Sequence, residues 1–235
     1  MIYILDYNRF YKTCSIEFLM VNGIQGGFYV TFDGPEGCGK STQVDLLNRR
    51  LILEGYEVVS TKEPGGTIIA DKIRSVVLER GEEDIGPLTE LFLFEAARNH
   101  LRLQVIIPSL NDGKIVLSDR SGHSSMAYQG YAGNVDVRIV SRLNEIATEG
   151  IVPNLEFFLD RDVSEGLVAE VDQGRFNDKT VEYHEKVRQG FLEIARQEPQ
   201  RRVVVNYRQG DVEGMQEEIY KVTKEKIGSM VVAKG

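Results

Sequence analysis

One short segment, residues 34–41, restricts the possible folds of this chain more than any other feature. It reads Gly34-Pro35-Glu36-Gly37-Cys38-Gly39-Lys40-Ser41 and fits the pattern G-x-x-x-x-G-K-[ST]. Residues 28–33 (FYVTFD) before it favour a short strand, and residues 40–53 after it place apolar side chains on one helical face. The pattern requires this strand, loop and helix order if the loop is to bind phosphate groups.

The residue types of this loop suit a polyphosphate. Glycines let successive N–H groups turn toward phosphate oxygens, and the following helix directs the positive end of its dipole at them. The pattern assigns Lys40 to the β- and γ-phosphates and Ser41 to a magnesium ion. The alternative is an ordinary glycine turn that caps a helix. We also predict that this environment lowers the pKa of the Cys38 thiol, so that oxidation blocks the site.

Further strand patterns occur at intervals along the chain and alternate with helical patterns. They lie at residues 57–62 (EVVSTK), 114–119 (KIVLSD), 155–160 (LEFFLD) and 201–207 (RRVVVNY). Strands that alternate with helices form parallel crossovers. We therefore predict an α/β fold, a doubly wound parallel five-stranded sheet with helices on both faces, of the P-loop NTPase type. Ligands of such sheets bind at the carboxyl ends of the strands.

Composition limits the partners and the compartment. The net charge of -8 over 235 residues argues against nucleic acid, and no run approaches the roughly 18 apolar residues of a membrane span. The two cysteines, Cys14 and Cys38, form neither a zinc spacing nor a disulfide framework, so we expect a cytoplasmic protein. We predict one domain, residues 28–235. Residues 1–27 lack a signal-peptide pattern and are expected to be an extension, either poorly ordered or read upstream of a true start at Met20.

A phosphate-binding loop alone does not identify the reaction. Residues 119–122 (DRSG) fit the D-x-x-G string of GTPase switches, but no N-K-x-D string, which would read guanine, occurs in the chain. A GTPase is therefore disfavoured.

Three more strings carry a family resemblance. They are residues 61–67 (TKEPGGT), 91–100 (LFLFEAARNH) and 118–130 (SDRSGHSSMAYQG). Together with the glycine loop, their order and spacing resemble the thymidylate kinase family, from about Phe28 to the C-terminus. The resemblance implies phosphorylation of dTMP to dTDP with ATP and Mg²⁺ in dTTP biosynthesis, by a homodimer. The alternatives are another nucleoside monophosphate or deoxynucleoside kinase, and a nucleotide-binding module of low activity.

The resemblance also implies residue roles. Phe94 would stack on thymine, Arg98 one helical turn later would contact the base, and Glu36 would contact the sugar 3′-hydroxyl. The implied dTMP-binding residues are Glu36, Glu63, Pro64, Arg74, Phe94, Arg98, Arg120, Ser125, Tyr128 and Gln129. The implied ATP-binding residues are Gly34, Pro35, Glu36, Gly37, Cys38, Gly39, Lys40, Ser41 and Thr42. Core packing for Phe94 and a solvated surface position for Arg74 are the structural alternatives.

Catalysis is assigned to Lys40, Asp119, Arg120 and Arg175. Asp119 with Ser41 would hold the metal ion, and Arg120 would bind the acceptor phosphate. Arg175 is predicted to supply a transition-state cation from a lid segment at about residues 168–182, with a solvated loop arginine as the alternative.

Three positions depart from the family strings. Lys62 replaces an arginine, Ser121 replaces an aromatic residue, and Asp33 replaces a glutamate.

Overall fold

A central parallel sheet organises the molecule. The computed structural model describes residues 24, 26–81, 83, 85–169 and 174–232. The strands are β1 (Phe28–Asp33), β2 (Val58–Lys62), β3 (Ile115–Asp119), β4 (Leu155–Asp160) and β5 (Arg202–Asn206). All pair in parallel in the order β2-β3-β1-β4-β5, so the predicted fold class is confirmed. The strand bounds differ from the predicted ones by at most one residue at either end.

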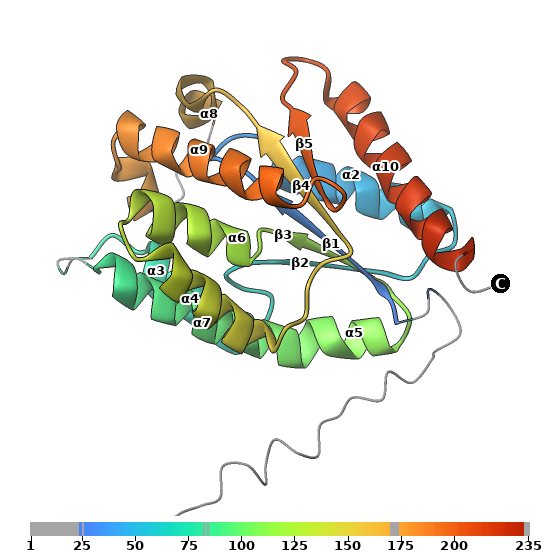
Figure 1. The fold of residues 1–235 in the computed structure, drawn as a ribbon, viewed down its shortest axis with the longest axis horizontal. Coiled ribbons are helices and arrows are strands. Elements are labelled where there is room, and N and C mark those ends of the chain that lie inside the picture. Colours follow the sequence, from blue (N-terminus) through green and yellow to red (C-terminus); the bar gives the residue numbers. More distant parts are fainter. Residues whose placement is uncertain (1–23, 25, 82, 84, 170–173, 233–235) are drawn as a thin grey trace, which may run out of the picture.

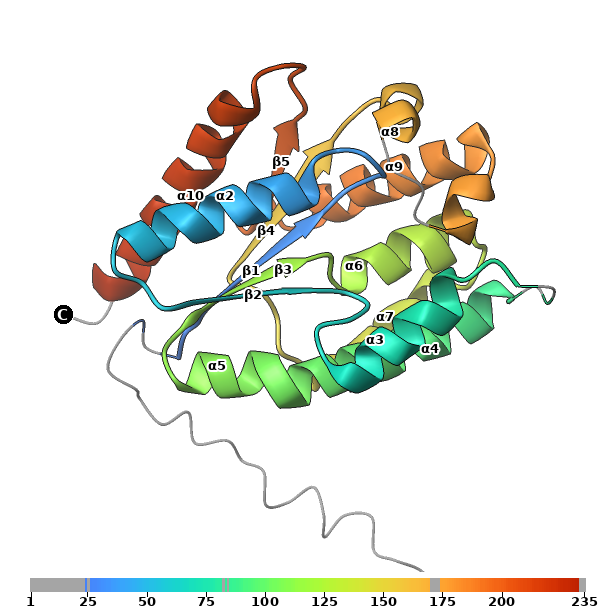
Figure 2. The same ribbon diagram turned by 180° about the vertical axis from the view of Figure 1, so that it is seen from behind.

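Helices cover both faces of the sheet (Figures 1 and 2). The α-helices are α2 (Lys40–Leu53), α3 (Ile68–Leu78), α4 (Pro87–Leu101), α5 (Ile107–Asn111), α6 (Gly122–Ser125), α7 (Val137–Thr148), α8 (Val163–Ala169), α9 (Val181–Gln197) and α10 (Val212–Val232). Two π-helical segments, η1 (Arg102–Ile106) and η2 (Met126–Ala132), and a 3₁₀ turn, η3 (Arg175–Asp178), complete the fold. Figure 2 shows α2 and α10 in front of the sheet, whereas Figure 1 shows α9 in front of the opposite face.

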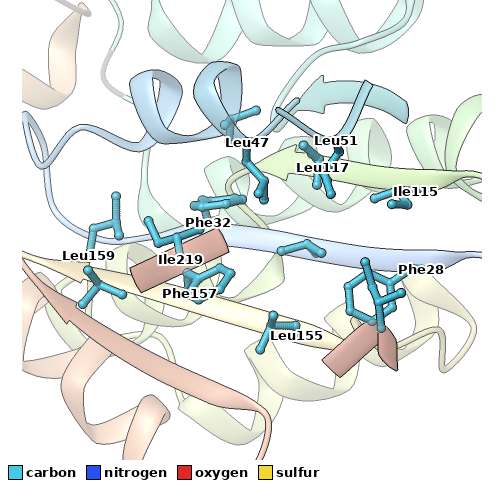
Figure 3. Close-up of a cluster of buried hydrophobic side chains, with 14 of the residues drawn as sticks. Phe28, Phe32, Leu47, Leu51, Ile115, Leu117, Leu155, Phe157, Leu159 and Ile219 are labelled. Atoms are coloured by element: carbon cyan, nitrogen blue, oxygen red, sulfur yellow. The ribbon is translucent and has the colours of Figure 1, made fainter. Parts of the chain in front are cut away.

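Alternating strand residues supply a separate apolar layer to each face. Phe28 and Phe32 of β1 point toward α2 and α10, where they pack with the side chains drawn in Figure 3. Tyr29, between them in the sequence, packs on the opposite face with Leu101 and Val116. Each fully buried side chain of this size contributes about 1.5–3 kcal/mol of transfer free energy. The central position of β1 explains why all six of its residues are buried.

Two segments of our domain prediction, the N-terminal extension and the lid, fall partly outside the described residues. Most of the predicted extension, residues 1–23 and 25, is not described, but Ile24 is 7% exposed and belongs to the main core. Residues 170–173 of the predicted lid are likewise outside the description. Its described flanks are the end of α8 and the turn η3, which leads into α9.

Candidate active site

The glycine loop lies between the carboxyl end of β1 and the start of α2, where the fold predicts a ligand. Gly34 and Gly37 adopt φ values of 144° and 64°, which side chains disfavour. A Cβ on Gly34 would lie 2.3 Å from the Leu159 carbonyl oxygen, and one on Gly37 would lie 2.0 Å from the Gly166 carbonyl oxygen. The loop therefore needs glycine both for its curvature and for its close packing against β4 and α8.

Lys40 and Ser41 face the hollow that the glycine loop borders. The Lys40 ammonium donates to the carbonyl oxygens of Gly34 (3.2 Å) and Pro35 (2.7 Å), so its charge lies within the curl of the loop. The Ser41 hydroxyl donates to a carboxylate oxygen of Asp119 at 2.5 Å. The structure thus brings together a lysine, a hydroxyl and a strand-end carboxylate that are up to 79 positions apart in the chain.

The predicted reactivity of Cys38 is wrong. Its side chain is fully buried, and this burial raises the pKa of the thiol, although Lys40 and Arg120 act in the opposite direction. The Lys40 ammonium is 3.5 Å from the sulfur, but desolvation of the thiolate outweighs that attraction. Cys38 is therefore a packed, protonated thiol rather than a reactive one.

A hollow lies beside the glycine loop, between α3, α4 and η2. All ten predicted dTMP-binding residues line it, together with four others that we did not predict: Leu78, Ser121, Ser124 and Phe176. Phe94 is half-buried, and its ring centroid is 6.2 Å from that of Phe176. The hollow therefore has an aromatic wall suited to a flat ring and polar groups at its other boundaries.

A second hollow follows the glycine loop itself. Seven of the nine predicted ATP-binding residues line it, Glu36 to Thr42, with Asp119 and others. The two hollows share four residues: Glu36, Glu63, Arg74 and Arg120. Two arginines thus stand where the hollows meet, so two anionic ligands bound in them would face each other across positive charge.

Arg98 is buried at the floor of the first hollow, with 3% of its surface exposed. Its Nε donates to Glu63 at 2.7 Å, one terminal nitrogen donates to Glu95 and Asn144, and the other donates to Ser125 Oγ at 3.1 Å and the Ser121 carbonyl oxygen at 3.3 Å. These bonds use all five N–H groups of a guanidinium. An oxygen of the thymine base could therefore bind Arg98 only by sharing an N–H group that already donates to the protein. Arg98 therefore organises the pocket wall as well as lining it.

Glu36 connects the glycine loop to the acceptor hollow. One carboxylate oxygen accepts from the Tyr128 hydroxyl at 2.8 Å and the other from Arg120 at 2.6 Å. Burial alone would raise the pKa of Glu36, but the nearby charges of Arg120 and Lys40 lower it to about 2. Glu36 is therefore ionised at neutral pH, and it holds Arg120 at the junction of the hollows.

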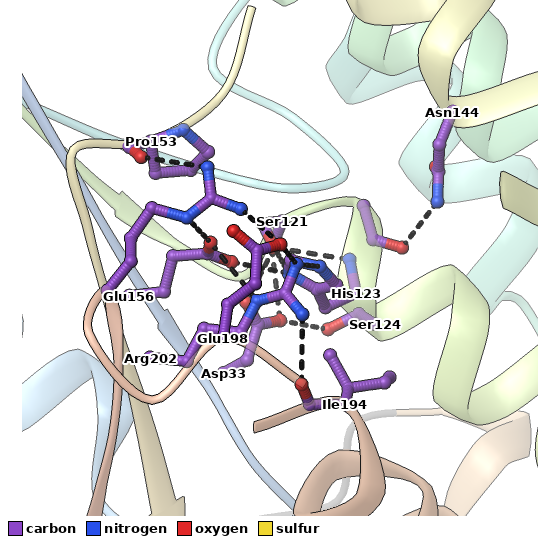
Figure 4. Close-up of polar contacts among 12 residues, drawn as sticks. Asp33, Ser121, His123, Ser124, Asn144, Pro153, Glu156, Ile194, Glu198 and Arg202 are labelled. Atoms are coloured by element: carbon purple, nitrogen blue, oxygen red, sulfur yellow. Dashed lines mark hydrogen bonds and ion pairs between the residues drawn. The ribbon is translucent and has the colours of Figure 1, made fainter. Parts of the chain in front are cut away.

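Two departures from the family strings, Asp33 and Ser121, contact each other. Ser121 Oγ donates to Asp33 at 2.6 Å, and Ser124 Oγ donates to the other oxygen of Asp33 at 2.7 Å (Figure 4).

His123 lies next to these residues and contacts a buried acid. Its Nδ1 lies 2.7 Å from the Glu156 carboxylate, while Arg202 lies 3.2 Å from Nε2. Because an arginine only donates, Nε2 accepts and the proton is on Nδ1.

Arg175 is not at the glycine loop. Its guanidinium donates to the Val77 and Ile85 carbonyl oxygens and forms an ion pair with Glu90 at 2.6 Å. These contacts hold it behind the aromatic wall of the first hollow, next to Phe176. Nothing in this arrangement supports the transition-state role that we predicted for Arg175, because its charge is already paired with a buried carboxylate.

The sequence analysis missed Arg161 and Tyr207, which line the second hollow. Arg161 donates to the Gly37 carbonyl oxygen at 2.6 Å, and its guanidinium carbon is 3.9 Å from the centroid of the Tyr207 ring. Its Nε–H has no hydrogen-bond partner among the described residues, and the Glu165 carboxylate lies 3.8 Å from this nitrogen. Both residues follow the last residues of neighbouring strands, β4 and β5, where a parallel sheet places its ligands. Their positions directly after two predicted strands were the signal by which the sequence could have identified them.

The oxygen donors at the glycine loop suit a hard divalent cation. Mg²⁺ is commonly held by one or two protein oxygens, with phosphate oxygens and waters completing its six ligands. Ser41 Oγ and the Asp119 carboxylate offer such a pair. Within the described ranges no three His, Cys, Asp or Glu side chains cluster as a metal site. No helix in those ranges is long and apolar enough for a bilayer span.

Comparisons with known proteins place these features in a family. The thymidylate kinase family model matches residues 32–219. A thymidylate kinase of Pelobacter propionicus is 43% identical over 202 residues, which is 82% of this chain and 92% of that protein. One of Geobacter sulfurreducens is 40% identical over 193 residues, 78% and 91% of the respective chains. The crystal structure of thymidylate kinase from Ehrlichia chaffeensis is similar, with a TM-score of 0.71 at 32% identity over 84% of this chain and 99% of that one.

Proposed function

The chain belongs to the thymidylate kinase family, and from this premise we propose how its residues divide the work of the reaction. The activity is phosphorylation of dTMP to dTDP, a step of dTTP biosynthesis, with ATP and a divalent metal ion. The assignment of roles rests on one observation: the two hollows meet at Glu36, Glu63, Arg74 and Arg120. We assign the glycine-loop hollow to ATP and the aromatic-walled hollow to dTMP, with their phosphates directed toward each other.

On the ATP side, backbone N–H groups of residues 36–42 bind the polyphosphate, and Lys40 moves its ammonium from loop carbonyl oxygens to the β- and γ-phosphates. We propose Mg²⁺ as the metal ion, held by Ser41 and Asp119. When bound, it neutralises charge that develops on the transferred group. The Ser41–Asp119 contact at 2.5 Å supports this role, because it brings both oxygen ligands to one point.

On the acceptor side, Arg120 and Arg74 bind the 5′-phosphate of dTMP. Burial is the main cause that lowers the pKa of Arg74, and repulsion from the neighbouring Arg120 lowers it further. A phosphate bound between the two guanidinium groups would relieve this repulsion. Glu36 holds Arg120 in place and offers its remaining lone pairs to the sugar 3′-hydroxyl. Glu63 and Pro64 form the turn that closes this end of the pocket.

Thymine lies against Phe94, with Phe176 completing the aromatic wall. Arg98, Ser125 and Gln129 face the polar edge of the base, and Tyr128 lies near the deoxyribose. Ser125 supports this reading, because its oxygen accepts from Arg98 at 3.1 Å and so directs its own proton elsewhere.

The γ-phosphoryl group passes in line to a 5′-phosphate oxygen, and positioning with cations supplies most of the acceleration. No strong base is needed, because the acceptor phosphate is already largely ionised at neutral pH. We propose Arg161 in place of Arg175 as the further cation near the transferring group. Its place in the lining of the ATP hollow and its bond to the Gly37 carbonyl oxygen support that role.

We further propose a homodimer. Six large apolar side chains on the outer helices are about half exposed: Ile69 and Val76 of α3, Leu88 and Phe92 of α4, and Ile139 and Ile146 of α7. The helix α4 packs against both α3 and α7, so these side chains lie on neighbouring helices. A cytoplasmic location, without nucleic acid as partner, fits the free buried thiol of Cys38 and the net charge of -8.

A coupled assay of ADP release tests the proposed function. Purified protein is given ATP and Mg²⁺, alone and with dTMP, dUMP, dCMP or thymidine. We expect release to depend on an acceptor and to be fastest with dTMP. Faster release with dCMP or thymidine would favour a different nucleoside or nucleotide kinase, and release that no acceptor stimulates would favour a nucleotide-binding module.

A further inference from the structure

Gln129, in the wall of the acceptor hollow, is held from behind by a buried carboxylate. Its Nε2 donates to Glu90 Oε2 at 2.8 Å, and the other oxygen of Glu90 accepts from Arg175 at 2.6 Å. Glu90 comes from the first turn of α4, Gln129 from η2, and Arg175 from η3. Three separate segments therefore meet at the Glu90 carboxylate.

These contacts fix the orientation of the Gln129 amide group. A carboxylate paired with a guanidinium can only accept hydrogen bonds, so the NH₂ group must point toward Glu90. The amide oxygen then points away from Glu90. Gln129 is 1% exposed and lines the hollow, yet this oxygen has no hydrogen-bond partner in the described part of the chain. Such an orphaned acceptor is costly unless a ligand supplies a donor.

Thymine supplies the matching donor. Its polar edge presents N3–H between two carbonyl oxygens, whereas cytosine presents an unprotonated N3. We propose that Glu90, paired with Arg175, is a positioning residue that holds the Gln129 oxygen toward N3–H and so selects thymine over cytosine. The inference rests on the proposed function and deepens it. It makes Arg175 part of base selection, and it assigns no role in telling dTMP from dUMP, because uracil has the same N3–H.

The arrangement makes an isosteric substitution informative. In Glu90→Gln, Arg175 still donates to an oxygen at position 90, so the new NH₂ group faces Gln129. The Gln129 amide must then turn its oxygen toward position 90 and its NH₂ toward the ligand. That orientation repels N3–H and matches the bare N3 of cytosine. The substitution therefore disfavours dTMP and favours dCMP at the same time. A general loss of packing would not favour dCMP.

The test measures kcat/KM for dTMP and dCMP with saturating ATP. Glu149→Gln is the matched control, because it removes a carboxylate that pairs with Arg102 outside both hollows. We expect Glu90→Gln to lower the ratio of dTMP to dCMP by at least about tenfold, mainly through KM for dTMP, and the control to leave it within about twofold. A site built to bind an N–H group can discriminate by up to about 10⁴–10⁵-fold, so the range is measurable.

A second arm uses the wild-type protein with dTMP methylated at N3, which lacks the donor. We expect its inhibition constant against dTMP to be at least about tenfold above the KM of dTMP. Equal binding of this analogue, or a folded Glu90→Gln variant with unchanged selectivity, would overturn the inference. If Glu90→Gln does not fold, the analogue decides. Wild-type protein that leaves dTMP unphosphorylated would instead refute the proposed function.

Discussion

Replacing Arg98 with methionine should destabilise the fold strongly. The side chain is 3% exposed and pairs with two buried carboxylates, Glu63 and Glu95. Methionine fills much of the space but leaves both acids without their cation. Removing one partner of a buried ion pair costs about 3–5 kcal/mol. At about 2–4 °C per kcal/mol for a chain of this length, the melting temperature should fall by roughly 6–20 °C.

The pH dependence of this loss tests its cause. Burial raises the pKa of Glu63, and Arg98 opposes that rise, so removing Arg98 raises it further. A carboxyl group whose folded-state pKa exceeds its unfolded value destabilises the fold at high pH, and this cost declines as the pH falls from the folded value toward the unfolded one. The difference between variant and wild type should therefore be smaller at pH 5 than at pH 8.

Urea unfolding at both pH values measures the effect, with Arg196→Met as the control. Arg196 forms an exposed ion pair with Glu193, so its loss should cost less than about 1 kcal/mol at either pH. A loss below 1 kcal/mol for Arg98→Met at pH 8, or a loss that grows on acidification, would refute the reasoning.

Three further predictions concern the reaction and the loop. Lys40→Ala should lower kcat by roughly a hundredfold or more while leaving the melting temperature within a few degrees, and a near-normal kcat would remove its phosphate role. Arg161→Ala should lower kcat at saturating dTMP by at least about tenfold, whereas Arg175→Ala should chiefly raise KM for dTMP. If steady-state kinetics show instead that Arg175→Ala lowers kcat and Arg161→Ala raises KM, our original assignment of Arg175 is restored. The raised thiol pKa predicts that native Cys38 reacts with iodoacetamide far more slowly than in urea at pH 7.5, and equal rates would contradict it.

The sequence predicted the sheet well because its signals are local. Five apolar segments alternate with helical ones, and each observed strand lies within one residue of its predicted bounds. The glycine loop could also be predicted from the sequence, since Gly34 and Gly37 adopt backbone geometry that other residues disfavour. The acceptor residues came from family strings, and all ten line one hollow.

The sequence was least informative where contacts join distant segments of the chain. Nothing near Arg175 in the sequence indicates that Glu90, 85 positions away, pairs with it. Cys38 was judged by its neighbours in the loop, but its burial by the surrounding core decides its pKa. Arg161 carries no motif, and only the meeting of β4 with the loop at Gly37 reveals it.

The central claim is that the two hollows hold their ligands end to end across Arg74 and Arg120. A crystal structure with dTMP, Mg²⁺ and a non-hydrolysable ATP analogue tests it most directly. We predict thymine on Phe94 and a dTMP 5′-phosphate oxygen about 3–3.5 Å from the γ-phosphorus or its analogue, in line for transfer. A thymine ring bound away from Phe94, or phosphates separated by a protein side chain, would contradict the account.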